Sequence, residues 1–231
     1  MKRFKVINEK PDLKTLQRDG FICIDMHFHT RYSDGASKLA DVVKKAKKLG
    51  IGVSITDHNE IKGSVKLADN KDILTIPGIE VTSRQGLHML SYFEKVSELI
   101  GFYSEHIEDK KIRNSNFVDI SVEEIIEKAK QHNGTVIVPH PYGPAYTGIM
   151  NHIKNKSLSM DIFDHVDGVE AINGGELRMS NKKATILAFN LDKSFTGGTD
   201  GHNLYELGKV LTYAKAETRE DLLETIRKKM N

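Results

Sequence analysis

Residues 21–29 read FICIDMHFH, an apolar run that ends in two histidines one residue apart. Its β-branched and aromatic residues predict a buried strand. Because alternate side chains of a strand share a face, His27 and His29 are expected to point the same way, about 7 Å apart along the backbone. One metal ion can accept both imidazole rings. The stretch therefore predicts a buried strand that carries a pair of metal ligands at its end.

Outward from this stretch, short apolar runs alternate with segments of helical period, a pattern typical of β-α-β units that build a parallel sheet. Helices are predicted over 39–49 and from the capping boxes of Ser121 with Glu124 and of Thr218 with Asp221. The predicted strands span 21–26, 52–56, 73–76, 135–138, 168–172, 194–197 and 209–214.

Two architectures are compatible with seven such parallel strands. They could close into an α/β barrel or remain an open doubly wound sheet, and periodicity does not decide between the two. An additional strand over 87–93 is expected to pair with 79–82, since only a few residues separate these segments.

The composition predicts one globular domain over residues 1–231, with residues 1–20 as an extension packed on it. Hydrophobic residues make up 39% and charged residues 29%, which argues against disorder and membrane insertion, and the charged N-terminal residues do not resemble a signal peptide. We therefore expect a cytoplasmic protein with no membrane partner. The composition does not indicate the oligomeric state.

The charge balance is nearly even, with 34 Lys and Arg residues against 32 Asp and Glu residues. The basic residues are spread along predicted helical faces, for example over 44–48, and do not gather with aromatic residues. Such runs are typical of solvated helix surface. We therefore expect no duplex nucleic acid among the partners.

Further histidines and carboxylates follow the later predicted strands. The carboxyl ends of parallel strands meet at one rim, so these side chains are expected to converge. Imidazole and carboxylate without cysteine suit zinc, manganese or iron, and the number of ligands implies several ions with Glu80 shared between them. His106, His132, His152 and His165 lie elsewhere and are interpreted as surface or packing residues. The rim residues are Asp57, His58, Glu80, His88, His140, Asp200 and His202.

The order of these motifs closely resembles the polymerase and histidinol phosphatase (PHP) family, from about residue 21 to the end of the chain. The resemblance rests on residues 25–29, 33–35, 56–58, 77–80, 88, 139–141 and 198–202. It implies a distorted seven-stranded barrel that holds two or three divalent ions (manganese, zinc or iron).

The resemblance also implies how the ligands are shared among the ions. Glu80 would bridge the first two ions. The implied sets are His27, His29, Glu80 and Asp200 for one ion; Glu80, His88 and His140 for a second; and Asp34, His58 and His202 for a third.

Two further carboxylates, Asp25 and Asp57, are expected to orient ligating imidazoles, and Asp57 could alternatively accept a proton. A hydroxide that bridges the ions would attack phosphorus, with His202 or a metal-bound water as the suggested acid for the leaving group. Candidates for binding the phosphate are Arg31, Arg84, Arg178 and Asn173.

The predicted function is a metal-dependent phosphoesterase that hydrolyses small phosphate esters, such as a nucleotide, a nucleoside bisphosphate, a short oligonucleotide or a phosphomonoester. A histidinol-phosphate phosphatase is an alternative with the same chemistry. An amidohydrolase of a non-phosphate substrate and a non-catalytic metal-binding domain are alternatives from other classes.

Overall fold

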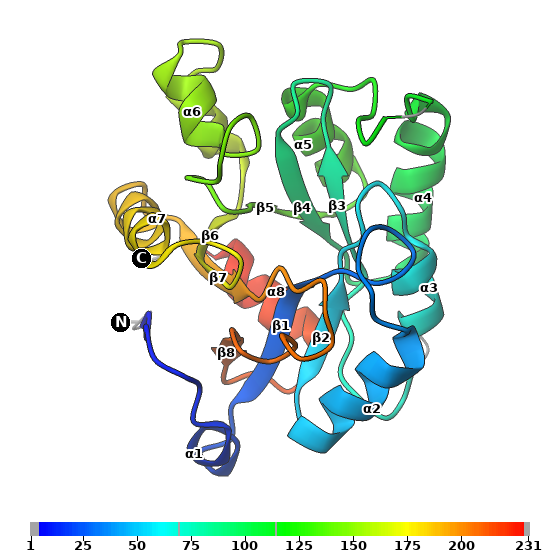
Figure 1. Cartoon of the computed structure of the whole chain (residues 1–231), viewed down its shortest axis with the longest axis vertical. Coiled ribbons are helices and arrows are strands. Elements are labelled where there is room, and N and C mark those ends of the chain that lie inside the picture. The colour runs from blue at the N-terminus through cyan, green and yellow to red at the C-terminus, as the bar shows by residue number, and fades with distance from the viewer. Residues whose placement is uncertain (1–4, 69, 114, 229–231) are drawn as a thin grey trace.

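A computed structural model of the chain describes residues 5–68, 70–113 and 115–228 as a mixed α/β fold (Figure 1). The strands are β1 (Ile22–Phe28), β2 (Gly52–Ile55), β3 (Gly78–Thr82), β4 (His88–Tyr92), β5 (Thr135–Val138), β6 (Gly168–Asn173), β7 (Ser194–Gly198) and β8 (Thr212–Ala214). The α-helices are α1 (Leu13–Arg18), α2 (Leu39–Leu49), α3 (Lys62–Ala68), α4 (Val96–His106), α5 (Val122–Gln131), α6 (Ile149–Lys154), α7 (Arg178–Asn190) and α8 (Arg219–Arg227). Two 3₁₀ helices are η1 (Glu108–Lys110) and η2 (Met160–His165).

The strands form two sheets. The first has the order β2-β1-β8, with β1 parallel to β2 and antiparallel to β8. The second has the order β3-β4-β5-β6-β7, in which β5, β6 and β7 are parallel and β4 runs antiparallel to both of its neighbours.

Both edge strands of the second sheet, β3 and β7, approach the first sheet. Beyond the end of β7, the amide of Asp200 donates to the carbonyl of His27 at 2.8 Å, and the amide of His29 donates to Gly201. On the other side, isolated parallel bridges join Val53 to Thr75 and His58 to Glu80. These contacts are single bridges, so the described residues form two sheets and no closed barrel.

The expected seven parallel strands are therefore not confirmed. Residues 73–76 make only the one bridge at Thr75, and Pro77 next to them has no backbone N–H to extend a ladder. The predicted strand over 209–214 shortens to the antiparallel β8. The expected pairing of 79–82 with 87–93 is confirmed as β3 with β4, because a connection over residues 83–87 is too short for a parallel crossover.

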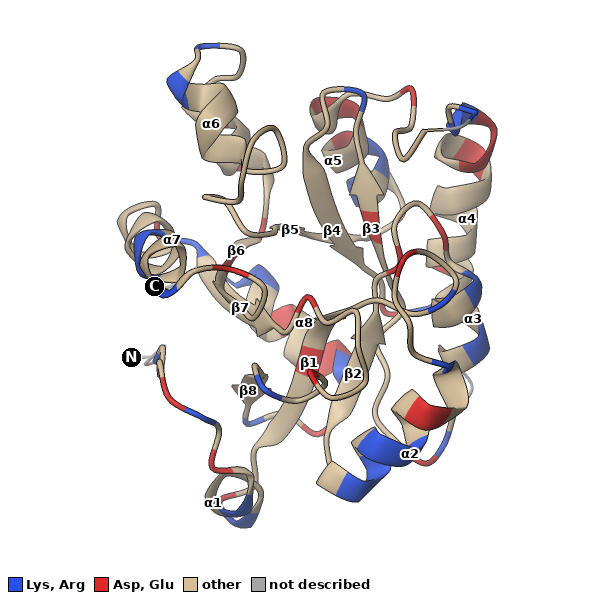
Figure 2. Ribbon diagram, viewed as in Figure 1, with Lys and Arg blue, Asp and Glu red and all other residues tan. Residues whose placement is uncertain are grey.

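Both predicted capping boxes are present. Ser121 Oγ accepts from the Glu124 amide while the Glu124 carboxylate accepts from the Ser121 amide, and Thr218 and Asp221 repeat this arrangement at α8. Most charged residues belong to helices and loops, whereas β1 and β3 each carry an acidic residue (Figure 2), and these two, Asp25 and Glu80, are buried.

The N-terminal segment packs on the domain as far as it is described. Leu13 and Leu16 of α1 pack against the core around β1 and β2, and the Gln17 amide donates to the carbonyls of Leu49 and Gly50 at 2.9 Å each. Residues 1–4 and 229–231 of the predicted domain lie outside the described residues.

We compared the described helices with the requirements of a membrane span. None of them has the length and apolar character that a bilayer span requires. The cytoplasmic location is not tested by this finding and stays a prediction.

Candidate metal centre

The ends of the strands bring the predicted ligands together although they lie far apart in the sequence. His27 and His29 follow each other on β1 and are fully buried, and Glu80 on β3 is 1% exposed. His88 begins β4, while His140 and Asp200 follow β5 and β7. All nine predicted metal ligands lie in one connected cluster.

Four donor atoms converge at the first predicted ion position. His27 Nε2 and His29 Nε2 lie 3.1 Å apart, and each is 3.3 Å from Glu80 Oε2. Asp200 Oδ1 lies 3.3 and 3.1 Å from the same two nitrogens. Ligands placed tetrahedrally about 2.0–2.1 Å from a zinc ion are about 3.3–3.4 Å apart, so this donor set fits a divalent ion.

The electrostatics of this position also favour a cation. Burial alone would lower the pKa of His27, but the carboxylates of Asp200, Glu80 and Glu170 outweigh it and raise that pKa well above its usual range. Within the described residues, the buried atoms His29 Nδ1, Glu80 Oε2 and His140 Nδ1 have no hydrogen-bond partner. Several carboxylates surround two buried imidazoles here, and buried nitrogen and oxygen atoms lack hydrogen-bond partners. This is a suitable environment for positive charge.

Glu80 lies between this position and the second predicted one. Its Oε1 is 3.1 Å from His88 Nδ1 and 3.2 Å from His140 Nε2, and its Oε2 is 3.1 Å from His58 Nδ1. The donor atoms close enough to share an ion here are those of His58, Glu80 and His88. Glu80 thus reaches both positions, as a bridging carboxylate must.

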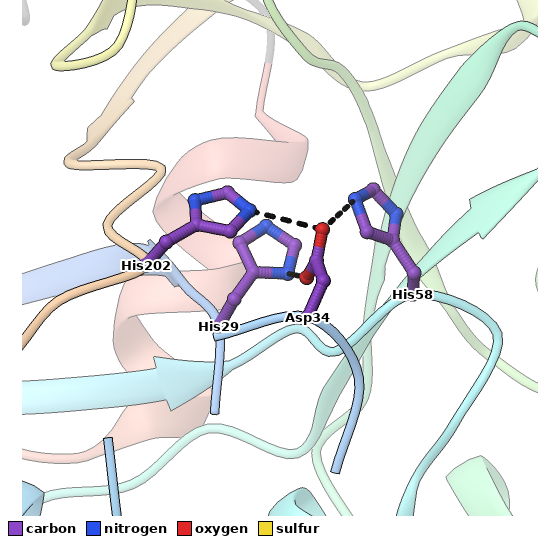
Figure 3. A group of neighbouring side chains, drawn as sticks. All are labelled: His29, Asp34, His58 and His202. Atoms are coloured by element: carbon purple, nitrogen blue, oxygen red, sulfur yellow. Dashed lines mark hydrogen bonds and ion pairs between the residues drawn. The ribbon is translucent and has the colours of Figure 1, made fainter. Parts of the chain in front are cut away.

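The third position is the most open to solvent. Figure 3 shows three imidazoles, from His29, His58 and His202, directed at the carboxylate of Asp34. His202 Nε2 lies 3.2 Å from Asp34 Oδ2, and the two side chains are 38% and 51% exposed. The hydrogen bond with Asp34 raises the pKa of His202 to about 9. How the ligands divide among the ions stays a prediction.

One residue of the site, Glu170 on β6, was not identified from the sequence. It is 1% exposed, its Oε1 lies 3.0 Å from His27 Nδ1, and its Oε2 accepts from the His140 amide at 3.0 Å. Holding the proton of His27 on Nδ1 leaves Nε2 free for an ion. The available signal was a glutamate inside the otherwise apolar predicted strand 168–172.

The expectation that Asp25 and Asp57 orient imidazoles is wrong. Asp25 accepts from the amide and hydroxyl of Thr199 at 2.9 and 2.7 Å and from the Gly208 amide, so it holds the loop that carries Asp200 and His202.

Asp57 has the same kind of role for the first ligand loop. It accepts from the amide and hydroxyl of Thr30 at 2.6 and 2.8 Å and from the hydroxyl of Ser33. Burial raises the pKa of Asp57. Its alternative role as a proton acceptor stays a prediction.

The ligand loops are tightly constrained. His140 and Asp200 have φ values of 26° and 49°, in a region that non-glycine residues rarely adopt. A Cβ at Gly198 would lie 2.5 Å from the backbone nitrogen of His27. Only glycine at this position lets β7 approach β1 closely enough for Asp200 to meet His27 and His29.

The predicted phosphate-binding residues differ in their surroundings. Arg31 and Arg178 are exposed, and Arg31 lines a small cavity with Tyr32, Ser37, Lys38 and Leu39.

By contrast, Arg84 is engaged away from the ligands, 2.6 Å from Glu124 and 3.5 Å from Asp119. Asn173 is buried, and its amide donates to Glu170 at 2.8 Å and to Asp200 at 3.1 Å. It therefore supports metal-site carboxylates. Contact of any of these four residues with substrate stays a prediction.

Two family models match the chain. The PHP domain model matches residues 25–138, and the PHP-associated model matches residues 178–230. The chain is also 33% identical over 165 residues to an uncharacterised protein of Methanocaldococcus jannaschii, a match that covers 64% of this chain and 80% of the relative.

Solved structures of similar fold come from proteins of several kinds. An endonuclease Q complex with a 27-mer duplex has a TM-score of 0.71 at 18% identity, and the match covers 90% of this chain but only 56% of that one. A putative metal-dependent phosphoesterase from Bifidobacterium adolescentis has a TM-score of 0.57 at 19% identity and coverages of 88% and 94%. An amidohydrolase from Chromobacterium violaceum has a TM-score of 0.63 at 16% identity and coverages of 88% and 96%.

The expectation that excludes duplex nucleic acid is wrong. The endonuclease Q chain, whose fold is similar, holds a duplex with an abasic lesion at its active site. Net charge averages over the whole surface, whereas binding of a phosphate backbone depends on the local field around a groove. A nearly even charge balance therefore cannot rule out this class of partner.

Proposed function

Because the chain belongs to the PHP domain family, we propose that it is a metal-dependent hydrolase of phosphate esters. The observation that carries the proposal is the position of Glu80, whose two carboxylate oxygens face five imidazoles. A shared carboxylate of this kind is what two neighbouring divalent ions require.

Two or three ions of manganese, zinc or iron would be held by His27, His29, Asp34, His58, Glu80, His88, His140, Asp200 and His202. When bound, such ions lower the pKa of a coordinated water and neutralise phosphate oxygens. In our proposal Glu170 keeps His27 in the tautomer that presents Nε2, and the hydrogen bonds to Asp57 fix the loop that carries Asp34. Of the three predicted arginines, Arg31 and Arg178 are exposed, and we propose that they bind phosphate.

His202 is proposed to donate the proton to the leaving group. Its ring is partly exposed, and when it holds no ion its hydrogen bond to Asp34 raises its pKa to about 9, so that it carries a proton above neutral pH. An acid needs a proton at working pH and access to substrate, and His202 has both when the third position is without an ion, because one ring nitrogen cannot bind an ion and a proton together.

The proposed substrates are a nucleotide, a nucleoside bisphosphate, an oligonucleotide or a small phosphomonoester such as histidinol phosphate. Because the endonuclease Q structure contains a duplex, the substrate panel should include duplex DNA with an abasic site. An amidohydrolase reaction and a non-catalytic role remain the alternatives.

We also propose that both matched segments belong to one domain. In support, Asp25 of the first segment accepts hydrogen bonds from Thr199 and Gly208 of the second. β1 also pairs with β8.

The test is phosphate release by protein reconstituted with manganese, zinc or iron, measured over the substrate panel. His27→Ala should reduce turnover at least about 100-fold, because it removes a ligand rather than a supporting group. His152→Ala is the matched control, since its ring lies on α6 and contacts the Tyr146 carbonyl. Unchanged turnover in His27→Ala would contradict the metal assignment, and silence of metal-loaded protein over the whole panel would favour the alternatives.

A further inference from the structure

A second group of metal-type ligands lies outside the candidate centre. His132 Nε2 is 3.3 Å from His106 Nε2 and 3.5 Å from Glu105 Oε2, and the carboxylate oxygen is 3.9 Å from His106 Nε2. We propose that Glu105, His106 and His132 bind a divalent transition ion of the zinc class. Their separations approach the spacing of about 3.3–3.4 Å expected for ligands around zinc.

This site is separate from the candidate centre. His132 lies just before β5 and His140 just after it, so they lie at opposite ends of that strand. Glu105 and His106 lie in the last turn of α4, which contacts α5. An ion here would join the ends of two helices and would not touch the predicted ligands of the rim.

The two imidazoles are held in place before any ion arrives. The ring of Phe102 lies 6.2 Å from the His106 ring and 6.3 Å from the His132 ring, between centroids. The side chains of His106 and His132 are only 19% and 18% exposed. Preorganised rings lose little conformational freedom on binding, which favours affinity.

A glycine inside α4 makes room for this arrangement. A Cβ at Gly101 would lie 3.0 Å from His132 Nδ1, closer than side chains normally approach. Glycine in a helix interior costs roughly 0.5–1 kcal/mol relative to alanine. The unfavourable glycine at position 101 is therefore the residue that leaves space for the His132 ring.

The charges around the site favour a cation on balance. His106 is the last residue of α4 and His132 caps the end of α5, so the partial negative charges of two helix C-termini meet there. Glu105 adds a full negative charge, while Lys110 and Lys128 oppose it from nearby. The 62% exposure of Glu105 leaves water free to complete the coordination.

The experiment counts zinc ions per folded chain at saturation in the wild-type protein, His106→Ala, His132→Ala and the control His152→Ala. The first two variants should bind one ion fewer than the wild type, and the control should bind the same number. Glu105→Gln should weaken this one ion at least about tenfold, because a charged ligand becomes a neutral one. Equal zinc counts in all four proteins would overturn the proposal.

A second measurement covers the case in which a variant does not fold. In the wild-type protein, the NMR signals of the His106 and His132 rings should shift together during a zinc titration, while the His152 signals should not. Signals of His106 and His132 that stay unchanged at saturating zinc would also overturn the proposal.

Discussion

At the scale of single residues, Glu170 shows how strongly one buried carboxylate can determine a metal site. It contacts His27 Nδ1, the His140 amide and the Asn173 side chain, so it links β6 to β1 and to the loop after β5. Glu170→Gln should weaken metal binding about 10–100-fold, because a neutral amide does not hold the His27 tautomer. Competition with a chelating dye measures this change. The exposed Glu123→Gln should leave affinity unchanged, and equal affinities of both variants would contradict the role.

Arg31 and Arg84 differ in whether the guanidinium already pairs with carboxylates, and this difference predicts which of them binds phosphate. Arg31→Gln should lower kcat/KM at least about tenfold, because an exposed guanidinium close to the ligands is free to bind phosphate. Arg84→Gln should have little effect, since Arg84 already pairs with Glu124 and Asp119. Steady-state kinetics of the two variants on the best phosphate ester decide the assignment. A larger loss in Arg84→Gln would reverse it.

At the scale of elements, α8 packs on the second sheet through Leu222, Leu223 and Ile226, and one polar side chain adds hydrogen bonds to this contact. Arg227 donates to Glu94 at 2.6 Å, to the Thr135 hydroxyl at 2.7 Å and to the Asn133 carbonyl at 2.8 Å. Arg227→Ala should reduce the free energy of unfolding by about 1–3 kcal/mol, because three polar partners lose a charged donor. Arg227→Lys should restore only part of it. Urea unfolding measures both, and full stability of the lysine variant would contradict a need for the planar group.

The junction of α4 and α5 should respond to pH in metal-free protein. Burial and then the neighbouring His132 lower the pKa of His106 below 6.5, with Lys128 and Lys110 acting in the same direction and Glu105 against them. The unfolded chain therefore binds protons first as pH falls. The wild-type protein should lose stability relative to His106→Gln as pH falls from about 7 to 5. A difference between the two unfolding curves that does not change with pH would contradict this.

At the scale of the whole molecule, the candidate centre joins both sheets and should couple metal to folding. Removing an ion present at 100 times its dissociation constant costs about 2.7 kcal/mol per site. It also leaves Glu80 buried beside His27, His29 and His140 without a cation. Chelation should therefore lower Tm by several degrees, measured by calorimetry. Manganese or zinc should restore the Tm, and a Tm that is insensitive to chelation would contradict the coupling.

The sequence by itself determined most of the strands and the residue types at the rim. The predicted helix over 39–49 is α2, both capping boxes are present, and every predicted ligand lies in the cluster. These features depend on periodicity and on position relative to a strand end, which neighbouring residues specify. Only the tertiary structure decided which strands pair antiparallel, where the sheets separate, and that Arg84 turns to Glu124. The contact of His27 with Glu170 joins residues 143 positions apart, and a contact at that separation leaves no local pattern because it depends on how the strands pack.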